Sequence, residues 1–179
     1  MRPKQLSYTP GDDSLTGYVS NATGATVTLA AAGPGDGMAH LVIITNDSAV
    51  DHSDNGETIT LVGTDADGDA QTEAVAGPAA STTSTSTKYF RTLTSITPSI
   101  TWVTDTYDVG WTDDVVSPTY VPDYKQAPFN MGIGTDVSGT INFTLQQKFD
   151  DCFYSTLAYS SKTWFNHSSI ASKTADTDG

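Results

Sequence analysis

Apolar and polar residues alternate along several short segments of this chain, which is the period-2 pattern of strands that bury one face. The clearest early example is residues 57–63, where Ile59 and Leu61 alternate with threonines. The acidic sequence DADGD at 65–69 then interrupts the pattern with residues that tolerate turn conformations, and a polar, Thr-bearing segment follows at 70–76. This order predicts a β-hairpin with an acidic, solvated tip.

Other segments have the same strand-like character, and turn-forming sequences such as GPGDG, NDSAVDHSDNG and GPAASTTSTST connect them. The further strand candidates are residues 25–31, 39–45, 88–97, 100–103 and 106–111. Short strands at this spacing are typical of sandwiches and barrels. We therefore expect an all-β protein with one or two β-sandwich or jelly-roll-like units of short antiparallel strands.

Proline and glycine positions predict how these strands are grouped. Residues 1–24 are expected to form an extended N-terminal arm and residues 25–116 a β-sandwich domain. Residues 117–128 contain three prolines, which deny ladder hydrogen bonds, so this segment is expected to be a linker. Residues 129–179 form a second, smaller β unit, in which 138–149 is the clearest one-sided strand.

The second unit contains only two clear strand segments, and its last residues are polar and small. Either the unit has few strands, or a neighbouring chain completes it by pairing with its edge. The second alternative predicts a homo-oligomer.

The net charge is −13, with only eight Lys and Arg residues scattered along the chain. Because nucleic-acid binding depends on basic groups that neutralise phosphates, we expect no nucleic-acid partner. No apolar run approaches the roughly 20 residues of a membrane span, so no membrane partner is expected. The N-terminal sequence lacks the apolar region of a signal peptide, which predicts a product made in a cytoplasm.

No residue pattern predicts catalysis or a metal site. The tip at 65–69 fails the EF-hand spacing, because Gly68 is at loop position 4 and Ala76 at position 12. The paired aspartates are adjacent in sequence, so their side chains point to opposite faces of a strand. Cys152 is alone and is expected to pack as a small apolar residue. We therefore expect a non-enzymatic protein without a cofactor.

The histidines and tryptophans are also expected to be structural. His40, His52 and His167 have no metal-ligand spacing, and His52 lies in a polar loop. Trp102 and Trp111 lie within strand-like segments and are expected to fill a core rather than to stack on sugars.

Two pairs of sequence segments resemble sequences of small structural proteins of tailed bacteriophages. The first is ITLVGTDADGDAQTEAVAGP with the later TKYFRTLTSITPS, and the second is QAPFNMGIGTDVSGTINFTLQQKFDD with the downstream WFNHSS. Together they cover roughly residues 40–170. The resemblance implies a virion component that is assembled in the host cytoplasm.

This resemblance implies a non-enzymatic virion structural protein, with a head decoration or cement protein that binds the major capsid protein favoured. A trimer is the favoured oligomer if the protein decorates a phage head. A tail, neck or fibre-anchor protein of the virion is the first alternative. A carbohydrate-binding module for host-surface glycans is the second, favoured only if Trp102, Trp111 and Trp164 are exposed. The residues expected to contact the partner are Arg2, Leu6, Tyr8, Tyr120, Tyr124 and Phe129.

Overall fold

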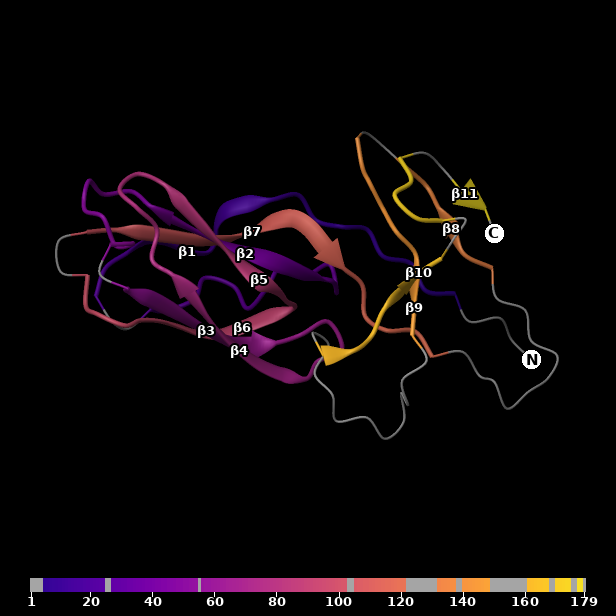
Figure 1. The fold of residues 1–179 in the computed structure, drawn as a ribbon, viewed down its shortest axis with the longest axis horizontal. Coiled ribbons are helices and arrows are strands. Elements are labelled where there is room, and N and C mark those ends of the chain that lie inside the picture. Colours follow the sequence, from indigo (N-terminus) through magenta and orange to yellow (C-terminus); the bar gives the residue numbers. More distant parts are fainter. Residues whose placement is uncertain are drawn as a thin grey trace. The chain divides into compact units, whose positions relative to one another are not determined.

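The computed structural model of the chain separates into two compact units, residues 1–119 and 120–179 (Figure 1). The division between them falls inside the segment expected to be a linker. The residues that the structure describes are 5–24, 27–54, 56–102, 105–121, 132–137, 140–148, 161–167, 170–174 and 177–178. These residues form antiparallel strands and no α-helix, which confirms the predicted all-β class.

Unit 1 is a sandwich of two antiparallel sheets (Figure 1). Its strands are β1 (Ser14–Ala22), β2 (Ala39–Asn46), β3 (Thr58–Thr64), β4 (Ala70–Ala76), β5 (Thr83–Phe90), β6 (Thr92–Pro98) and β7 (Tyr107–Val116). The four-stranded sheet has the order β1-β7-β2-β5, and the three-stranded sheet has the order β4-β3-β6. The last strand of the unit, β7, is therefore inserted between β1 and β2.

Alternating residues of both sheets build the core between them. In β3, Ile59 and Leu61 are buried while the threonines between them are partly exposed, as the alternation predicts. The predicted hairpin is also present, because β3 and β4 pair in continuous register from Thr58–Ala76 to Thr64–Ala70. The largest buried side chains of the core are Tyr18, Val42, Ile44, Phe90, Leu93, Ile96, Trp102, Tyr107 and Val109.

Side chains close one side of the sandwich, where β4 and β5 are edge strands of different sheets. The two carboxylate oxygens of Glu73 in β4 accept hydrogen bonds from the backbone amides of Thr87 and Lys88 in β5, at 2.7 and 2.9 Å. The Gln71 side chain donates to the carbonyl of Tyr89 at 2.5 Å. Unpaired strand edges invite association with other chains, so these bonds protect the edge of β5.

The opposite side is closed by the segment between β1 and β2. The amide of Ala30 donates to the carbonyl of Tyr18 in β1, and the amide of Leu93 in β6 donates to the carbonyl of Ala32. Val27 and Leu29 pack against the core. The prediction of a strand at 25–31 is wrong for its described part, because residues 27–31 join neither ladder. Ala30 makes a single backbone bond to β1, and the bond to β6 comes from the next described residues, at Ala32.

Other sequence-based predictions for unit 1 also need correction. The strand expected at 100–103 is wrong, because its described residues, 100–102, belong to no strand. The expected arm, 1–24, contains β1, which pairs with β7 along its length. The expected single strand at 88–97 is two strands in different sheets, and the chain crosses between the sheets at Arg91. The burial pattern changes at this crossing, because Phe90 and Leu93 are both buried although they lie three residues apart.

Unit 2 contains short strand pairs. β8 (Gly134–Thr135) pairs with β11 (Thr177–Asp178), and β9 (Gln146–Gln147) pairs with β10 (Phe165–Asn166). The expected long strand at 138–149 is wrong over its described residues, which form only β9 and one bridge, from Phe143 to Lys173. Completion of this unit by a neighbouring chain stays a prediction.

Candidate functional site

The six residues expected to contact a partner are distributed over both units. Leu6 and Tyr8 precede β1 in unit 1 and are exposed at 45% and 39% of their surface. Tyr120 belongs to unit 2 and is exposed at 42%. The remaining three, Arg2, Tyr124 and Phe129, lie outside the described residues.

The segment that carries Leu6 and Tyr8 is fixed to unit 1 at its C-terminal end. The amide of Gly11 donates to Asp36 Oδ2 at 2.9 Å. The Trp111 indole Nε1 donates to the carbonyl of Asp12 at 3.0 Å. Residues 5–13, called the N-terminal segment below, therefore begin as an exposed chain and end docked on the sandwich.

Asp36 is a buried carboxylate that bonds a histidine and two backbone amides. His40 in β2 is fully buried, and its Nε2 lies 2.7 Å from Asp36 Oδ2. Asp36 Oδ1 accepts from the amide of Met38 at 2.9 Å. Burial alone would raise the pKa of Asp36, but the hydrogen bonds from Gly11, Met38 and His40 outweigh it and hold that pKa below its usual range.

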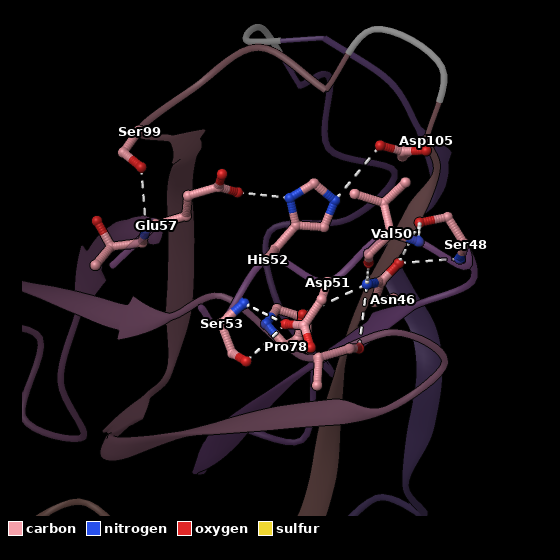
Figure 2. Close-up of polar contacts among 12 residues, drawn as sticks. Asn46, Ser48, Val50, Asp51, His52, Ser53, Glu57, Pro78, Ser99 and Asp105 are labelled. Atoms are coloured by element: carbon pink, nitrogen blue, oxygen red, sulfur yellow. Dashed lines mark hydrogen bonds and ion pairs between the residues drawn. The ribbon is translucent and has the colours of Figure 1, made fainter. Parts of the chain in front are cut away.

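A second buried histidine, His52, lies in the loop that follows β2 (Figure 2). His52 Nδ1 is 2.5 Å from Glu57 Oε2, and Nε2 is 3.5 Å from Asp105 Oδ2. The ring also stacks on Trp102, with centroids 3.6 Å apart and planes 10° apart. His52 thus joins its own loop to the start of β3 and to the loop before β7.

Asn46, at the end of β2, organises the neighbouring loops (Figure 2). Its amide nitrogen donates to the carbonyls of Val50 and Ala79, at 2.7 and 3.1 Å. Its amide oxygen accepts from the backbone and hydroxyl of Ser48. Together with the His52 contacts, these bonds give this end of the sandwich a defined loop conformation.

Neither acid–histidine pair has the arrangement of a catalytic dyad. In a hydrolase, the second ring nitrogen must be able to take a proton from a nucleophile. The second nitrogen of His40 donates instead to the carbonyl of Thr112 at 2.7 Å, and that of His52 faces the carboxylate of Asp105. Both histidines therefore join segments of the fold. The described residues contain no cluster of three or more potential metal ligands.

The acidic tip of the β3–β4 hairpin is more integrated than the sequence predicts. Asp65 is buried, and its Oδ1 accepts from the amides of Asp67 and Asp69, both at 3.0 Å. The Asp67 carboxylate accepts from the amide and the hydroxyl of Thr119, at 2.6 and 2.8 Å. The expected solvated tip is therefore wrong for Asp65 and Asp67, whose carboxylates cap the turn and hold the chain after β7, whereas Gly68 and Asp69 are exposed.

The tryptophans of unit 1 are structural, as expected. Trp102 is only 2% exposed and lies in the core between His52 and Tyr107. Trp111 is partly buried, and its ring meets that of Tyr18 edge-on at 5.0 Å. A flat sugar-binding platform needs exposed rings, so neither residue provides one.

The sequence did not reveal the roles of His40 and His52. Both interact with carboxylates from loops: Asp36 is four residues before His40, and Glu57 is five residues after His52. The only signal in the sequence was an acidic residue four or five positions away from a histidine, and this spacing is common by chance. Asp105 approaches His52 only through the fold.

Comparison of the chain with protein-family models, with curated protein sequences and with solved structures found no significant match. In the part of the chain that the structure describes, no helix is long and apolar enough to cross a membrane.

Proposed function

We propose that this protein is a non-enzymatic virion structural protein of the tailed-phage type, a head decoration protein that binds the major capsid protein. The observation that carries the proposal is the pair of exposed apolar side chains, Leu6 and Tyr8, on a segment whose base is docked at Gly11 and Asp12. The resemblance of residues 40–170 to phage structural proteins supplies the class of partner.

Exposed apolar groups on an anchored segment favour docking for a thermodynamic reason. Full burial of a Leu-sized side chain contributes about 1.5–3 kcal/mol. A segment that is already fixed at one end loses less conformational entropy on binding than a free tail does. Virion proteins act in many copies, so modest contacts by each chain sum over the particle.

The charge distribution indicates the complementary surface on the partner. Residues 1–119 contain fifteen Asp and Glu residues but only four Lys and Arg residues. A basic face on the capsid lattice would therefore attract unit 1 and increase the rate of its association.

The two alternatives are supported to different degrees. A tail, neck or fibre-anchor protein would use the same exposed residues, and only its position on the particle would differ. A glycan-binding module requires exposed tryptophans, and the burial of Trp102 and the packing of Trp111 against Tyr18 do not favour it. Trp164 is only partly exposed, and Lys148 Nζ lies 5.3 Å from the centre of its ring.

Occupancy on particles tests the proposal. The Leu6→Ala/Tyr8→Ala double variant should fold normally and bind particles more weakly. Leu15→Ala is the matched control, because Leu15 is 50% exposed but lies in β1. Deletion of residues 1–20 is unsuitable, since it would remove most of β1.

Electron cryomicroscopy of the particles then locates the protein. Density spread over the capsid lattice and lost only in the double variant would support decoration. Density confined to the tail vertex would replace decoration by the tail or neck alternative. Equal occupancy of the double variant and the wild type would contradict the assignment of Leu6 and Tyr8.

A further inference from the structure

One ring nitrogen of His52 is buried without a hydrogen bond. The side chain is only 4% exposed, and its Nε2 atom has no hydrogen-bond partner among the described residues. Nε2 faces Asp105 Oδ2 at 3.5 Å (Figure 2). Buried polar atoms are normally paired, because desolvation without a partner costs free energy. The approach of this nitrogen to a carboxylate therefore points to a group that binds both atoms.

The distance of 3.5 Å between Nε2 and Oδ2 distinguishes the possible bridging groups. A charge-assisted hydrogen bond would bring the two atoms to about 2.7–2.9 Å. A bridging water would hold them about 4.5 Å apart, because each of its hydrogen bonds is about 2.8 Å long. Two ligands of one tetrahedral zinc ion lie about 3.3–3.5 Å apart, given zinc–ligand bonds of about 2.0–2.2 Å. The observed distance agrees with the zinc geometry.

The other ring nitrogen makes the contact that is usual for metal-bound histidines. Nδ1 lies 2.5 Å from Glu57 Oε2. In metalloproteins a carboxylate at this nitrogen fixes the ring and keeps the hydrogen there, which leaves the lone pair of the other nitrogen for the metal. The indole of Trp102 stacks on the same ring, with centroids 3.6 Å apart, and adds to its fixed orientation. His52 is therefore held as a ligand would be.

We propose that His52 Nε2 and Asp105 Oδ2 bind a divalent transition-metal ion, with Zn²⁺ as the best fit, and that Glu57 positions the histidine. One nitrogen and one carboxylate oxygen suit zinc, whereas Ca²⁺ and Mg²⁺ prefer oxygen ligands. The side chains of Glu57 and Asp105 are 13% and 15% exposed, so water can complete the coordination. Two protein ligands agree with the lack of a three-ligand cluster among the described residues and fit a reversibly bound ion.

The bound ion joins two connections of unit 1. His52 lies in the loop after β2, and Asp105 precedes β7. An ion that binds only the folded protein stabilises it by mass action. A free Zn²⁺ concentration of about 100 times the dissociation constant should raise the thermal midpoint of unfolding by about 5–10 °C. This site goes beyond the docking function and does not involve Leu6 or Tyr8.

Titration of the intact protein with ZnCl₂ tests for the site. Calorimetry should show one saturable site in each chain, and the thermal midpoint should rise as the site fills. Asp105→Asn removes the carboxylate at a partly exposed position, so this variant should fold and lose both effects. Asp54→Asn is the matched control, because it removes the same charge from an exposed position of the loop that contains His52. It should keep both effects.

Nuclear magnetic resonance of the wild-type protein identifies the atoms that bind the ion. On addition of Zn²⁺ the Nε2 resonance of His52 should shift, while Nδ1 keeps its hydrogen. The ring of His40 should not respond, because both of its nitrogens contact oxygen atoms of the protein. MgCl₂ at the same concentration should leave the His52 resonances unchanged.

Three results would overturn the proposal. They are a wild-type protein without saturable Zn²⁺ binding, equal binding by Asp105→Asn and the wild type, and Zn²⁺-dependent shifts at His40 or His167 without one at His52. The resonance measurement needs no variant, so it decides the question even where Asp105→Asn does not fold. These experiments use no particle, so their outcome is independent of the docking experiments.

Discussion

At the scale of single residues, the polar groups inside unit 1 separate into those that join segments and those that have no visible role. His40, His52 and Asn46 each connect segments of the chain that are far apart in sequence. The hydroxyls of Tyr18 and Tyr107, by contrast, are buried and have no hydrogen-bond partner among the described residues. Substitution of His40, His52 or Asn46 should lower the free energy of unfolding, whereas removal of the two tyrosine hydroxyls should not.

Tyr107→Phe should stabilise the protein. A buried hydroxyl without a partner keeps its desolvation cost, so its removal is expected to raise the free energy of unfolding by about 1 kcal/mol. Burial also raises the pKa of Tyr107 to about 12. Unfolding releases that proton above pH of about 10, the unfolded value, so wild-type stability should fall between these two pH values.

Urea denaturation at neutral and alkaline pH measures both effects. In Tyr107→Phe the alkaline loss of stability should be smaller than in the wild type. Tyr8→Phe, at an exposed position, is the control and should change neither quantity. A clear destabilisation by Tyr107→Phe would show that the hydroxyl has a partner.

His52→Ala should destabilise unit 1 strongly. The substitution removes the stacking on Trp102 and leaves Glu57 and Asp105 around an empty volume. Loss of one member of such a buried group costs about 3 kcal/mol. Chemical denaturation measures the change, with Asp54→Ala as an exposed control in the same loop. A loss below about 0.5 kcal/mol, the range of surface substitutions, would mean that the cluster is not structural.

At the scale of elements, the sandwich is closed by contacts that are not strand ladders. Glu73 and Gln71 satisfy the edge of β5 on one side, and residues 27–33 bridge β1 and β6 on the other. Close backbone approach also shapes the sheet, because a Cβ on Gly110 in β7 would overlap the carbonyl oxygen of Ser14. Glycine at this position lets β1 follow β7 through its irregular register.

Glu73→Gln should weaken the β4–β5 closure. Both carboxylate oxygens accept hydrogen bonds from β5, and an amide would turn its NH₂ group towards one of these donors. We expect a loss of about 1–2 kcal/mol in the free energy of unfolding, and more association through the freed edge. Light scattering and denaturation measure the two effects.

Asp69→Asn is the matched control, because it removes one negative charge from the exposed tip of the same hairpin. If both variants lose stability equally, the effect comes from charge and not from the hydrogen bonds of Glu73.

At the scale of the whole molecule, the acidic charge is concentrated in residues 1–119. Like charges on one unit repel, and salt screens exposed charges over about 10 Å at 0.1 M. The thermal midpoint of unfolding should therefore rise as NaCl is increased from low concentration. Asp113→Lys/Asp114→Lys, at two exposed positions of β7, should reduce this dependence. Calorimetry measures the salt dependence of the thermal midpoint for the wild type and for the double variant. An equal salt dependence in the two proteins would contradict a dominant role for repulsion between like charges.

The local pattern of apolar, polar and turn-forming residues was sufficient to predict those parts of the fold that depend on residues close together in sequence. Alternation identified β3, an apolar run identified β2, and the turn residues at 65–69 followed by a polar segment identified β4 and the hairpin. It failed for β1, in which the large apolar residues Leu15, Tyr18 and Val19 do not alternate and whose partner, β7, is almost a hundred residues away. A strand of that kind is stabilised by its partner rather than by its own pattern.

The all-β class, the acidic surface and the core positions of the alternating strands could be predicted before the fold was known, because they follow from period, composition and the burial of apolar side chains. Only the tertiary structure decided which strands share a sheet, how the edges are closed and where buried acids meet histidines. Asp36 with His40, and Asp105 with His52, are pairs that loop geometry creates. Such pairs depend on where the backbone places each side chain, which residue type and spacing do not specify.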